Sequence, residues 1–268
     1  MVGRGFDRVA LCADDYDAVL FDLDGVVTDT AALHAASWKQ LFDDYLAMRA
    51  AHDGKPQAPF DLDKDYESFV DGKPRYEGVE SFLRSRDIEL PYGTFDDPPD
   101  AETVCGLGNR KNELFQALLR RDGVKPIPSS VAFIDAVRSL RLKTAVVSSS
   151  RNCATIMAAA RIDALFDAKV DGVYAAELKL KGKPDPDTFL AAARLLGASP
   201  KRTAVFEDAI AGVQAGRNGG FGLVVGVDRV GHANELKQNG ADVVVKELTE
   251  IKVGRAPSAE RQIDDLPS

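Results

Sequence analysis

Apolar and polar residues follow two kinds of pattern along this chain. Short apolar runs bounded by polar residues are typical of buried strands, and they occur at 19–23, 143–148, 169–173, 203–206, 223–227 and 242–245. Apolar residues spaced three or four apart are typical of helices, and they occur at 30–45, 66–85, 104–121, 131–140, 152–160, 187–196, 209–218 and 235–238. Residues 46–64 and 88–100 follow neither pattern and contain the helix breakers glycine and proline, so we expect irregular loops there.

The order of these elements predicts the fold class. From residue 126 onward, strands and helices alternate, which indicates a parallel sheet covered by helices on both faces. The first strand is separated from this region by a mostly helical stretch. We therefore predict an α/β protein with a Rossmann-like parallel-sheet core, built from residues 1–30 and 126–255, and an inserted helical cap domain at 31–125. The polar tail at 256–268 is predicted to be disordered.

Composition and charge exclude several classes of protein. The chain has 268 residues, of which 45% are hydrophobic and 28% charged, as in ordinary globular proteins. A net charge of −8 argues against a general nucleic-acid binder but permits an anionic substrate. Charges interrupt the N-terminal segment, and no long apolar run follows, so we expect neither a signal peptide nor a membrane span. Three widely spaced cysteines predict reduced thiols and a cytoplasmic location. The oligomeric state is not indicated.

Polar side chains follow the predicted central strands at the points where these strands end. Asp22 and Asp24 follow the first strand, residues 148–152 follow the second, and Glu207 and Asp208 follow the strand at 203–206. In open parallel sheets, ligands bind at the carboxyl ends of the strands. We therefore expect these residues to meet at one edge of the sheet.

The residue types at this edge indicate phosphoryl transfer. Asp22 and Asp24 are two apart and leave an extended strand on the same side, where they repel each other unless a cation lies nearby. Carboxylate oxygens, with Asp208 as a third contributor, suit Mg²⁺, which commonly shares its site with a substrate phosphate. Lys183 and Ser148 would face that phosphate. Asp22 could then attack phosphorus to form an aspartyl-phosphate, while Asp24 serves as acid and base.

Each of these features also has an ordinary explanation. Paired aspartates occur in loops, serines often cap helices, and acids are common in the first turn of a helix. Lys183 would be an unremarkable exposed lysine if it stood alone. The combination of four such features, each placed at a strand end or just before a helix, favours the functional interpretation.

The motifs FDLDG, VVSSS, GKPDPD and FED, in this order and spacing, resemble the four motifs of the haloacid dehalogenase superfamily. The resemblance covers nearly the whole chain and implies that Asp22 is the nucleophile and Asp24 the general acid and base. It implies Mg²⁺ as cofactor, held by Asp22, the carbonyl of Asp24 and Asp208, with Glu207 close behind. It also implies that Ser148 and Lys183 bind the transferring phosphoryl group.

Within this superfamily, the segment DLDGVVTDTAALHAASWK resembles the β-phosphoglucomutase family. That resemblance implies interconversion of β-D-glucose 1-phosphate and glucose 6-phosphate, through an aspartyl-phosphate and a glucose 1,6-bisphosphate. It also implies contacts with a phosphorylated sugar by Thr30, His34, Trp38, Arg75, Lys111, Asn112, Ser149, Ser150, Arg151 and Asn152. Gly78 departs from the family pattern, where a serine is expected, and the cap carries additions near 48–64 and 88–103.

Two other functions remain open at this point. The same four motifs serve phosphatases that act on sugar phosphates or small phosphate esters, and a non-catalytic phosphosugar-binding regulator is a further alternative. Arg75 and Lys111 are the residues that discriminate, because on an ordinary surface they would only be solvated cations. His34 could equally be a packed histidine, and Trp38 could belong to the core of the cap.

Overall fold

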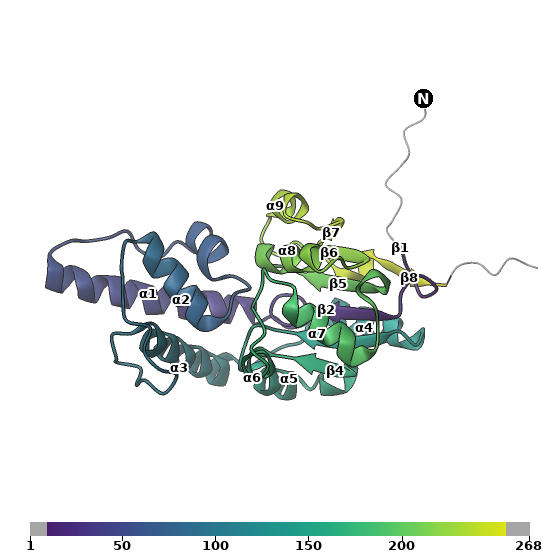
Figure 1. Cartoon of the computed structure of the whole chain (residues 1–268), viewed down its shortest axis with the longest axis horizontal. Helices are drawn as coiled ribbons and strands as arrows, with labels where there is room; N and C mark the ends of the chain where they lie inside the picture. Colours follow the sequence, from purple (N-terminus) through teal and green to yellow (C-terminus); the bar gives the residue numbers. More distant parts are fainter. Residues whose placement is uncertain (1–9, 256–268) are drawn as a thin grey trace, which may run out of the picture.

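The computed structural model describes residues 10–255, so the predicted disordered tail at 256–268 lies outside the described residues. Its centre is a six-stranded sheet with the order β4-β3-β2-β5-β6-β7, in which every pairing is parallel (Figure 1). The strands are β2 (Ala18–Phe21), β3 (Lys143–Val147), β4 (Ala168–Val170), β5 (Thr203–Glu207), β6 (Leu223–Val227) and β7 (Val243–Val245). The predicted α/β fold with a parallel sheet is confirmed.

Helices cover both faces of this sheet. One face is packed by α4 (Pro128–Ser139) and α5 (Cys153–Ala160), and the other by α7 (Asp187–Leu196), α8 (Ile210–Asn218) and α9 (Ala233–Gln238). Along β2, Val19 and Phe21 join the first hydrophobic cluster, whereas Ala18 and Leu20 join the second. Because side chains alternate between the faces of a strand and both faces are buried, the strands read as continuous apolar runs.

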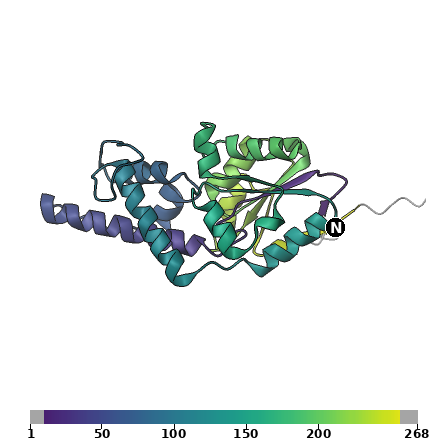
Figure 2. The same cartoon turned by 90° about the horizontal axis from the view of Figure 1, so that it is seen from below.

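A third hydrophobic cluster lies beside the sheet and is formed by residues from 38 to 107. The helices of this region are α1 (Ala31–Asp53), α2 (Arg75–Ser85) and α3 (Val104–Asp122). Figures 1 and 2 show them projecting from the carboxyl edge of the sheet, with α1 as the long purple helix. We call residues 31–125 the cap and propose that they form a domain separate from the core.

The cap differs from its predicted structure in two places. The irregular segment expected from residue 46 begins later, because helix-forming residues carry α1 on to Asp53 and Gly54, with φ of 68°, ends it. The single helix expected at 66–85 is broken into the π-helix η1 (Tyr66–Val70) and α2. Gly72 has φ of 69°, and Pro74 disfavours a helical residue before it. The break places the turn at residues 71–74 against the core.

Smaller differences concern short elements. The strand expected at 169–173 ends early, because the Asp171 carboxylate accepts the backbone N–H groups of Val173 and Tyr174 and begins α6 (Gly172–Glu177). A two-stranded parallel sheet, β1 (Ala10–Cys12) with β8 (Lys252–Gly254), was not expected, since three residues are too few to show a period. The short 3₁₀ helices are η2 (Asp163–Leu165), η3 (Pro200–Arg202) and η4 (Leu248–Glu250). Within residues 10–255, no helix is long and apolar enough to cross a membrane.

Candidate active site

A cavity lies between the carboxyl edge of the sheet and the cap, with about 700 Å³ of empty space that includes open solvent. Of the predicted site residues, its wall contains Asp22, Asp24, His34, Trp38, Arg75, Lys111, Asn112, Ser148, Ser149, Ser150, Arg151, Asn152, Glu207 and Asp208. Thr30 and Lys183 lie behind this wall, where each contacts one of the two motif aspartates. The structure therefore brings the polar strand ends together at one edge, as the sequence predicts.

Asp22 follows the end of β2 and is 7% exposed. One of its oxygens, Oδ2, accepts the backbone N–H of Asp24 at 2.8 Å, and the other lies 2.5 Å from Lys183 Nζ. The same ammonium group donates to Glu207 Oε1 and to the carbonyl of Val147, so its three donors are all directed at protein atoms. Burial opposes the charge of Lys183, but the two carboxylates outweigh this effect and raise its pKa. Lys183 thus orients the carboxylate of Asp22 from behind.

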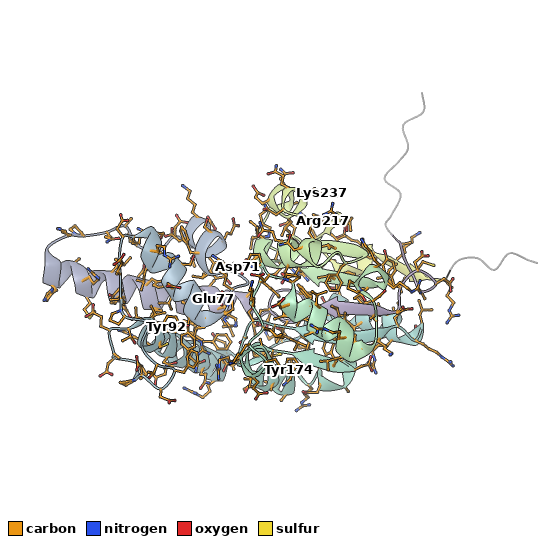
Figure 3. All side chains as sticks on the ribbon, viewed as in Figure 1. Asp71, Glu77, Tyr92, Tyr174, Arg217 and Lys237 are labelled. Carbon is orange, nitrogen blue, oxygen red and sulfur yellow. The ribbon has the colours of Figure 1, made fainter. Side chains whose placement is uncertain are left out.

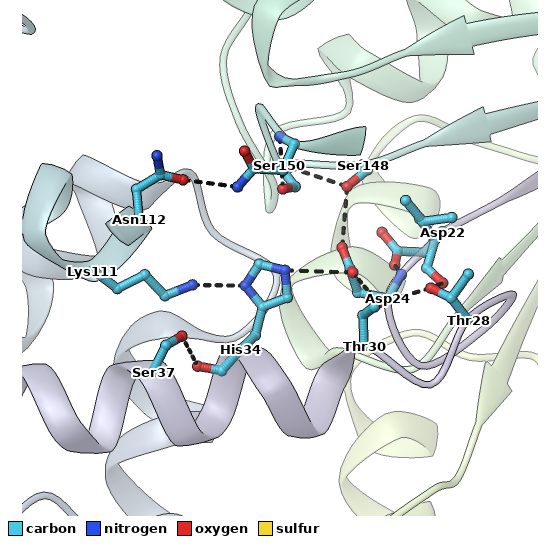
Figure 4. A network of polar contacts seen from close by, with 12 residues as sticks. Asp22, Asp24, Thr28, Thr30, His34, Ser37, Lys111, Asn112, Ser148 and Ser150 are labelled. Carbon is cyan, nitrogen blue, oxygen red and sulfur yellow. Dashed lines mark hydrogen bonds and ion pairs between the residues drawn. The ribbon is translucent and has the colours of Figure 1, made fainter. Parts of the chain in front are cut away.

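The carboxylate of Asp24 is held on several sides (Figure 4). The hydroxyl of Thr30 donates to Oδ1, and that of Ser148 donates to Oδ2 at 3.3 Å. His34 Nε2 lies 3.4 Å from Oδ1, within ion-pair distance. Burial raises the pKa of Asp24, but His34 and Thr30 outweigh burial and hold this pKa below its usual value. Thr30 is fully buried, so here it positions Asp24 and does not face the cavity.

A second layer connects His34 to helix α3. Lys111 Nζ lies 2.7 Å from His34 Nδ1 and is 4.8 Å from the centre of the Trp38 ring. Because the lysine nitrogen is the donor, Nδ1 accepts and the ring proton sits on Nε2, facing Asp24. His34 also stacks on Phe115. It is therefore both a packed histidine and a link between the cap and the second motif aspartate.

Arginine and amide groups occupy the end of the cavity formed by the cap and the loop after β3. Arg75 Nη2 donates to Asn112 Oδ1 at 2.9 Å, and Asn152 Nδ2 donates to the same oxygen at 2.9 Å. Burial lowers the pKa of Arg75, and the nearby charge of Arg151 lowers it further. Burial and Arg75 together lower the pKa of Lys111 well below its usual value. This end, which we call the cationic end, contains Arg75, Lys111 and Arg151.

Carboxylates crowd the opposite end, which we call the acidic end. Burial raises the pKa values of Asp22 and Asp208 well above the usual range, and neighbouring carboxylates add to both shifts. The turn after β2 approaches Asp208 so closely that a Cβ on Gly25, with φ of +86°, would lie 1.9 Å from Asp208 Oδ2. Only glycine fits there without displacing that carboxylate.

This donor set fits a divalent cation. Excess buried negative charge is relieved by a bound cation, and oxygen ligands suit Mg²⁺. Within the described residues 10–255, no three histidine, cysteine, aspartate or glutamate side chains already surround one point as metal ligands. An ion held here would complete its shell with backbone carbonyl, water and substrate oxygens, as Mg²⁺ commonly does.

The structure adds residues that the sequence analysis did not single out. Asp71 and Tyr66, both from the cap, line the acidic end (Figure 3 labels Asp71 where the cap meets the core). Burial and the charge of Glu207 raise the pKa of Asp71 to about 7. Asp71 lies four residues before Arg75, a predicted site residue, and this proximity is a usable sequence signal.

The departure at Gly78 has a packing reason. A Cβ on this residue would lie 3.2 Å from the indole ring of Trp38, which is 4% exposed and belongs to the hydrophobic cluster of the cap. A serine would press against that ring. Trp38 therefore serves the cap core while its edge lines the cavity, so both of its predicted environments occur together.

Known proteins resemble this chain in sequence and in fold. Residues 16–220 match the haloacid dehalogenase-like hydrolase family. A β-phosphoglucomutase of Mycobacterium bovis is 52% identical over 247 residues, covering 91% of this chain and 94% of that protein. The β-phosphoglucomutase of Bacillus subtilis is 34% identical over 235 residues, covering 87% and 91%. The crystal structure of β-phosphoglucomutase from Clostridium difficile superposes with a TM-score of 0.68 at 27% identity, covering 88% and 93%. This chain belongs to the haloacid dehalogenase-like hydrolase family.

Proposed function

We propose that the chain is a β-phosphoglucomutase, which interconverts β-D-glucose 1-phosphate and glucose 6-phosphate through a glucose 1,6-bisphosphate. The observation that carries this proposal is the division of one cavity into an acidic end with Asp22 and a cationic end with Arg75, Lys111 and Arg151. A sugar bisphosphate needs two anion sites at once, one at the nucleophile and one for the phosphate that is not reacting. The cationic end supplies the second site, and the acidic end would supply the first once a bound cation offsets its carboxylates.

The chemical step uses the two motif aspartates. An oxygen of Asp22 forms a bond to phosphorus while the bond between phosphorus and the sugar oxygen breaks, and the sugar oxygen takes the proton from Asp24. Asp24 gains this proton in the other half of the cycle, when its carboxylate, kept ionised by His34 and Thr30, removes it from the sugar hydroxyl that takes the phosphoryl group from Asp22. Lys183 holds Asp22 in a fixed orientation, and Thr30 and His34 do the same for Asp24.

Mg²⁺ is the proposed cofactor, because the acidic end carries more buried negative charge than Lys183 neutralises. Asp22, the carbonyl of Asp24 and Asp208 would hold the ion, and Glu207 would stay behind them on Lys183 and the backbone N–H of Ala209. When bound, the ion would offset the charge of the transferring phosphoryl group.

A mutase differs from a phosphatase in that it must keep water away from the aspartyl-phosphate, and the cap is the part of the chain that could do so. The aspartyl-phosphate must react with a sugar hydroxyl and not with water, so water must be excluded while the bisphosphate turns around. The hydrogen bond from Asn152 of the core to Asn112 of the cap, whose oxygen also accepts from Arg75, supports a closed cavity with a fixed phosphate site.

Because the thiols are free in this structure, we also expect a reducing compartment such as the cytoplasm.

The test follows the products formed from β-D-glucose 1-phosphate with Mg²⁺ and a trace of glucose 1,6-bisphosphate. We expect glucose 6-phosphate to accumulate with little free phosphate, and the α anomer to react poorly. Release of free phosphate without glucose 6-phosphate would contradict the mutase proposal.

A phosphatase is the second candidate, favoured by the hydrolase description of the matching family. Asp22 and Asp24 would act as above, with water in place of the sugar hydroxyl. Under this alternative the cationic end would serve substrate binding only. A non-catalytic regulator is less well supported, because Asp22, Asp24, Lys183 and Asp208 are all present and in contact or close by.

A further inference from the structure

We propose that the loop 228–232, between β6 and α9, couples closure of the cap to the placement of the metal-binding carboxylate Asp208, with His232 as the positioning residue. This inference rests on the proposed phosphoryl-transfer chemistry. It does not depend on whether the acceptor is a sugar or water. No sequence motif assigns a role to His232.

The imidazole of His232 lies between the cap and the core. It is 8% exposed, with Nδ1 at 3.0 Å from Glu67 Oε1 and Nε2 at 3.1 Å from the backbone carbonyl oxygen of Asp208. A carbonyl oxygen only accepts hydrogen bonds, so Nε2 carries a proton and donates to Asp208. One ring therefore contacts a cap side chain and the backbone of a proposed metal ligand.

The rest of the loop 228–232 contacts the turn at Gly25, which also forms part of the acidic end. Arg229 Nε donates to the carbonyl of Gly25 at 2.8 Å, and its Nη1 donates to the carbonyl of Lys246 at 2.8 Å. Asp228 Oδ1 accepts the backbone N–H groups of Gly231 and His232, at 2.6 and 2.9 Å, which fixes the entry to the histidine. Since the turn at Gly25 also touches Asp208, the loop holds both turns in one arrangement.

The cap segment on the other side of His232 leads directly to the cavity. Glu67 belongs to η1, and the same segment continues to Asp71 at the acidic end and to Arg75 at the cationic end. Its docking on the core includes a hydrogen bond from Ser149 Oγ to the carbonyl of Gly72 at 2.7 Å. Movement of this segment away from the core would break the contact between Glu67 and His232. Closure would restore it and tie the cap to the Asp208 loop.

Three variants separate the two contacts of His232. Glu67→Ala removes only the contact with the cap. His232→Gln keeps an N–H donor for the carbonyl of Asp208 but places an amide oxygen toward Glu67, so it also removes the cap contact. His232→Ala removes both. Ser68→Ala, at an exposed site in η1, and Asn234→Ala, at an exposed site in α9, are the matched controls.

Two binding measurements report on the two contacts. Calorimetric titration of the metal-free protein with Mg²⁺ gives the Kd at the acidic end. Fluorescence of the single tryptophan, Trp38, which lines the cavity, gives the Kd for glucose 6-phosphate. We expect Glu67→Ala and His232→Gln to weaken glucose 6-phosphate binding about fivefold. Their Kd for Mg²⁺, measured without the sugar phosphate, should stay within about twofold of the wild type, because no ligand holds the cap closed in that titration. His232→Ala should weaken both, each by about fivefold.

Unchanged glucose 6-phosphate binding in Glu67→Ala would overturn the cap contact, and unchanged Mg²⁺ binding in His232→Ala would overturn the link to Asp208. If His232→Ala does not fold, His232→Gln alone tests the proposal. An equal rise in its Kd for Mg²⁺ and its Kd for glucose 6-phosphate would overturn the assignment of one contact to the cap and the other to Asp208. If the wild-type protein does not bind glucose 6-phosphate, the proposed substrate fails. The KM for hydrolysis of p-nitrophenyl phosphate then replaces that Kd in the same comparison.

Discussion

The acidic and cationic ends of the cavity are built in different ways. At the acidic end, Asp22 and Glu207 are almost completely buried and are fixed by Lys183 and by backbone N–H groups at the ends of paired strands. At the cationic end, Arg75 and Lys111 extend on long side chains from helices of the cap. The comparison teaches that the proposed bond-breaking groups are set by the sheet, whereas two of the three cations proposed for the second phosphate, Arg75 and Lys111, belong to the cap.

At neither end is the charge fully offset by protein groups of the opposite sign. Burial and like charges raise the pKa values of Asp22 and Asp208, and they lower those of Arg75 and Lys111. A cation at the first end and a phosphate at the second would relieve both imbalances. Substitutions at the two ends should therefore affect different parts of the reaction.

The largest effect is expected at the acidic end. Asp22→Asn should lower both mutase turnover and hydrolysis of p-nitrophenyl phosphate by at least about 10³-fold, because the amide cannot form the phosphoryl intermediate. Asp44→Asn, on the half-exposed surface of α1, is the control and should keep full activity. Steady-state assays of both reactions measure this, and hydrolysis within tenfold of the wild type would remove Asp22 from its role.

A substitution at the cationic end should separate the two reactions. Arg75→Ala is expected to lower mutase turnover about 100-fold, since a charged hydrogen bond to phosphate contributes up to roughly 3 kcal/mol. Hydrolysis of the small ester should change by less than about threefold, because that ester has no second phosphate. Arg84→Ala, on the exposed face of the same helix, is the control. Equal losses in both assays would contradict the role given to Arg75.

The same contrast explains what the sequence could predict. The strand ends of the core were predictable because apolar runs show where strands stop, and parallel strands bring their ends together. The cap was harder, because the break between η1 and α2 depends on Gly72 and Pro74 within an otherwise helical pattern. Because the helix is broken between Val70 and Arg75, Asp71 lines the cavity.

Some contacts had no local signal at all. His232 meets Glu67 across 165 positions of sequence, and no periodicity reports a pairing of that kind. Lys183 was expected to face the phosphate, but its partners are protein carboxylates that the sequence places far away. The motif identifies Lys183 as a site residue, whereas its hydrogen-bond partners depend on the tertiary structure.

A smaller effect is expected at Lys111, which links the two ends through His34. Lys111→Met should lower mutase turnover about tenfold, since it removes one buried hydrogen bond while keeping the packing against Trp38. It should also raise the pKa of His34, because burial and the charge of Lys111 both lower this pKa in the wild type. NMR titration of the His34 ring measures the shift, with Arg110→Met as the neighbouring control. A His34 pKa equal to that of the wild type would show that Lys111 does not act on this ring.

The smallest effect concerns Asp71, where the cap itself adds a carboxylate to the acidic end. Burial and Glu207 raise its pKa from an ordinary value of 3.8 to about 7 in the folded protein. The folded state therefore holds a proton that the unfolded state has already released between these two pH values. Stability of the metal-free protein should fall as pH rises through this window, because the unfolded state binds fewer protons there.

Asp71→Asn should remove part of that loss. We expect its thermal midpoint in excess chelator to match the wild type near pH 4 and to exceed it by roughly 3 °C near pH 8. Asp100→Asn, at an exposed site in the cap, should follow the wild type at both pH values. Mg²⁺ should reduce the difference between Asp71→Asn and the wild type, since a cation at the acidic end offsets the repulsion between Asp71 and Glu207. If Asp71→Asn loses stability with rising pH as steeply as the wild type, Asp71 does not interact electrostatically with the carboxylates of the acidic end.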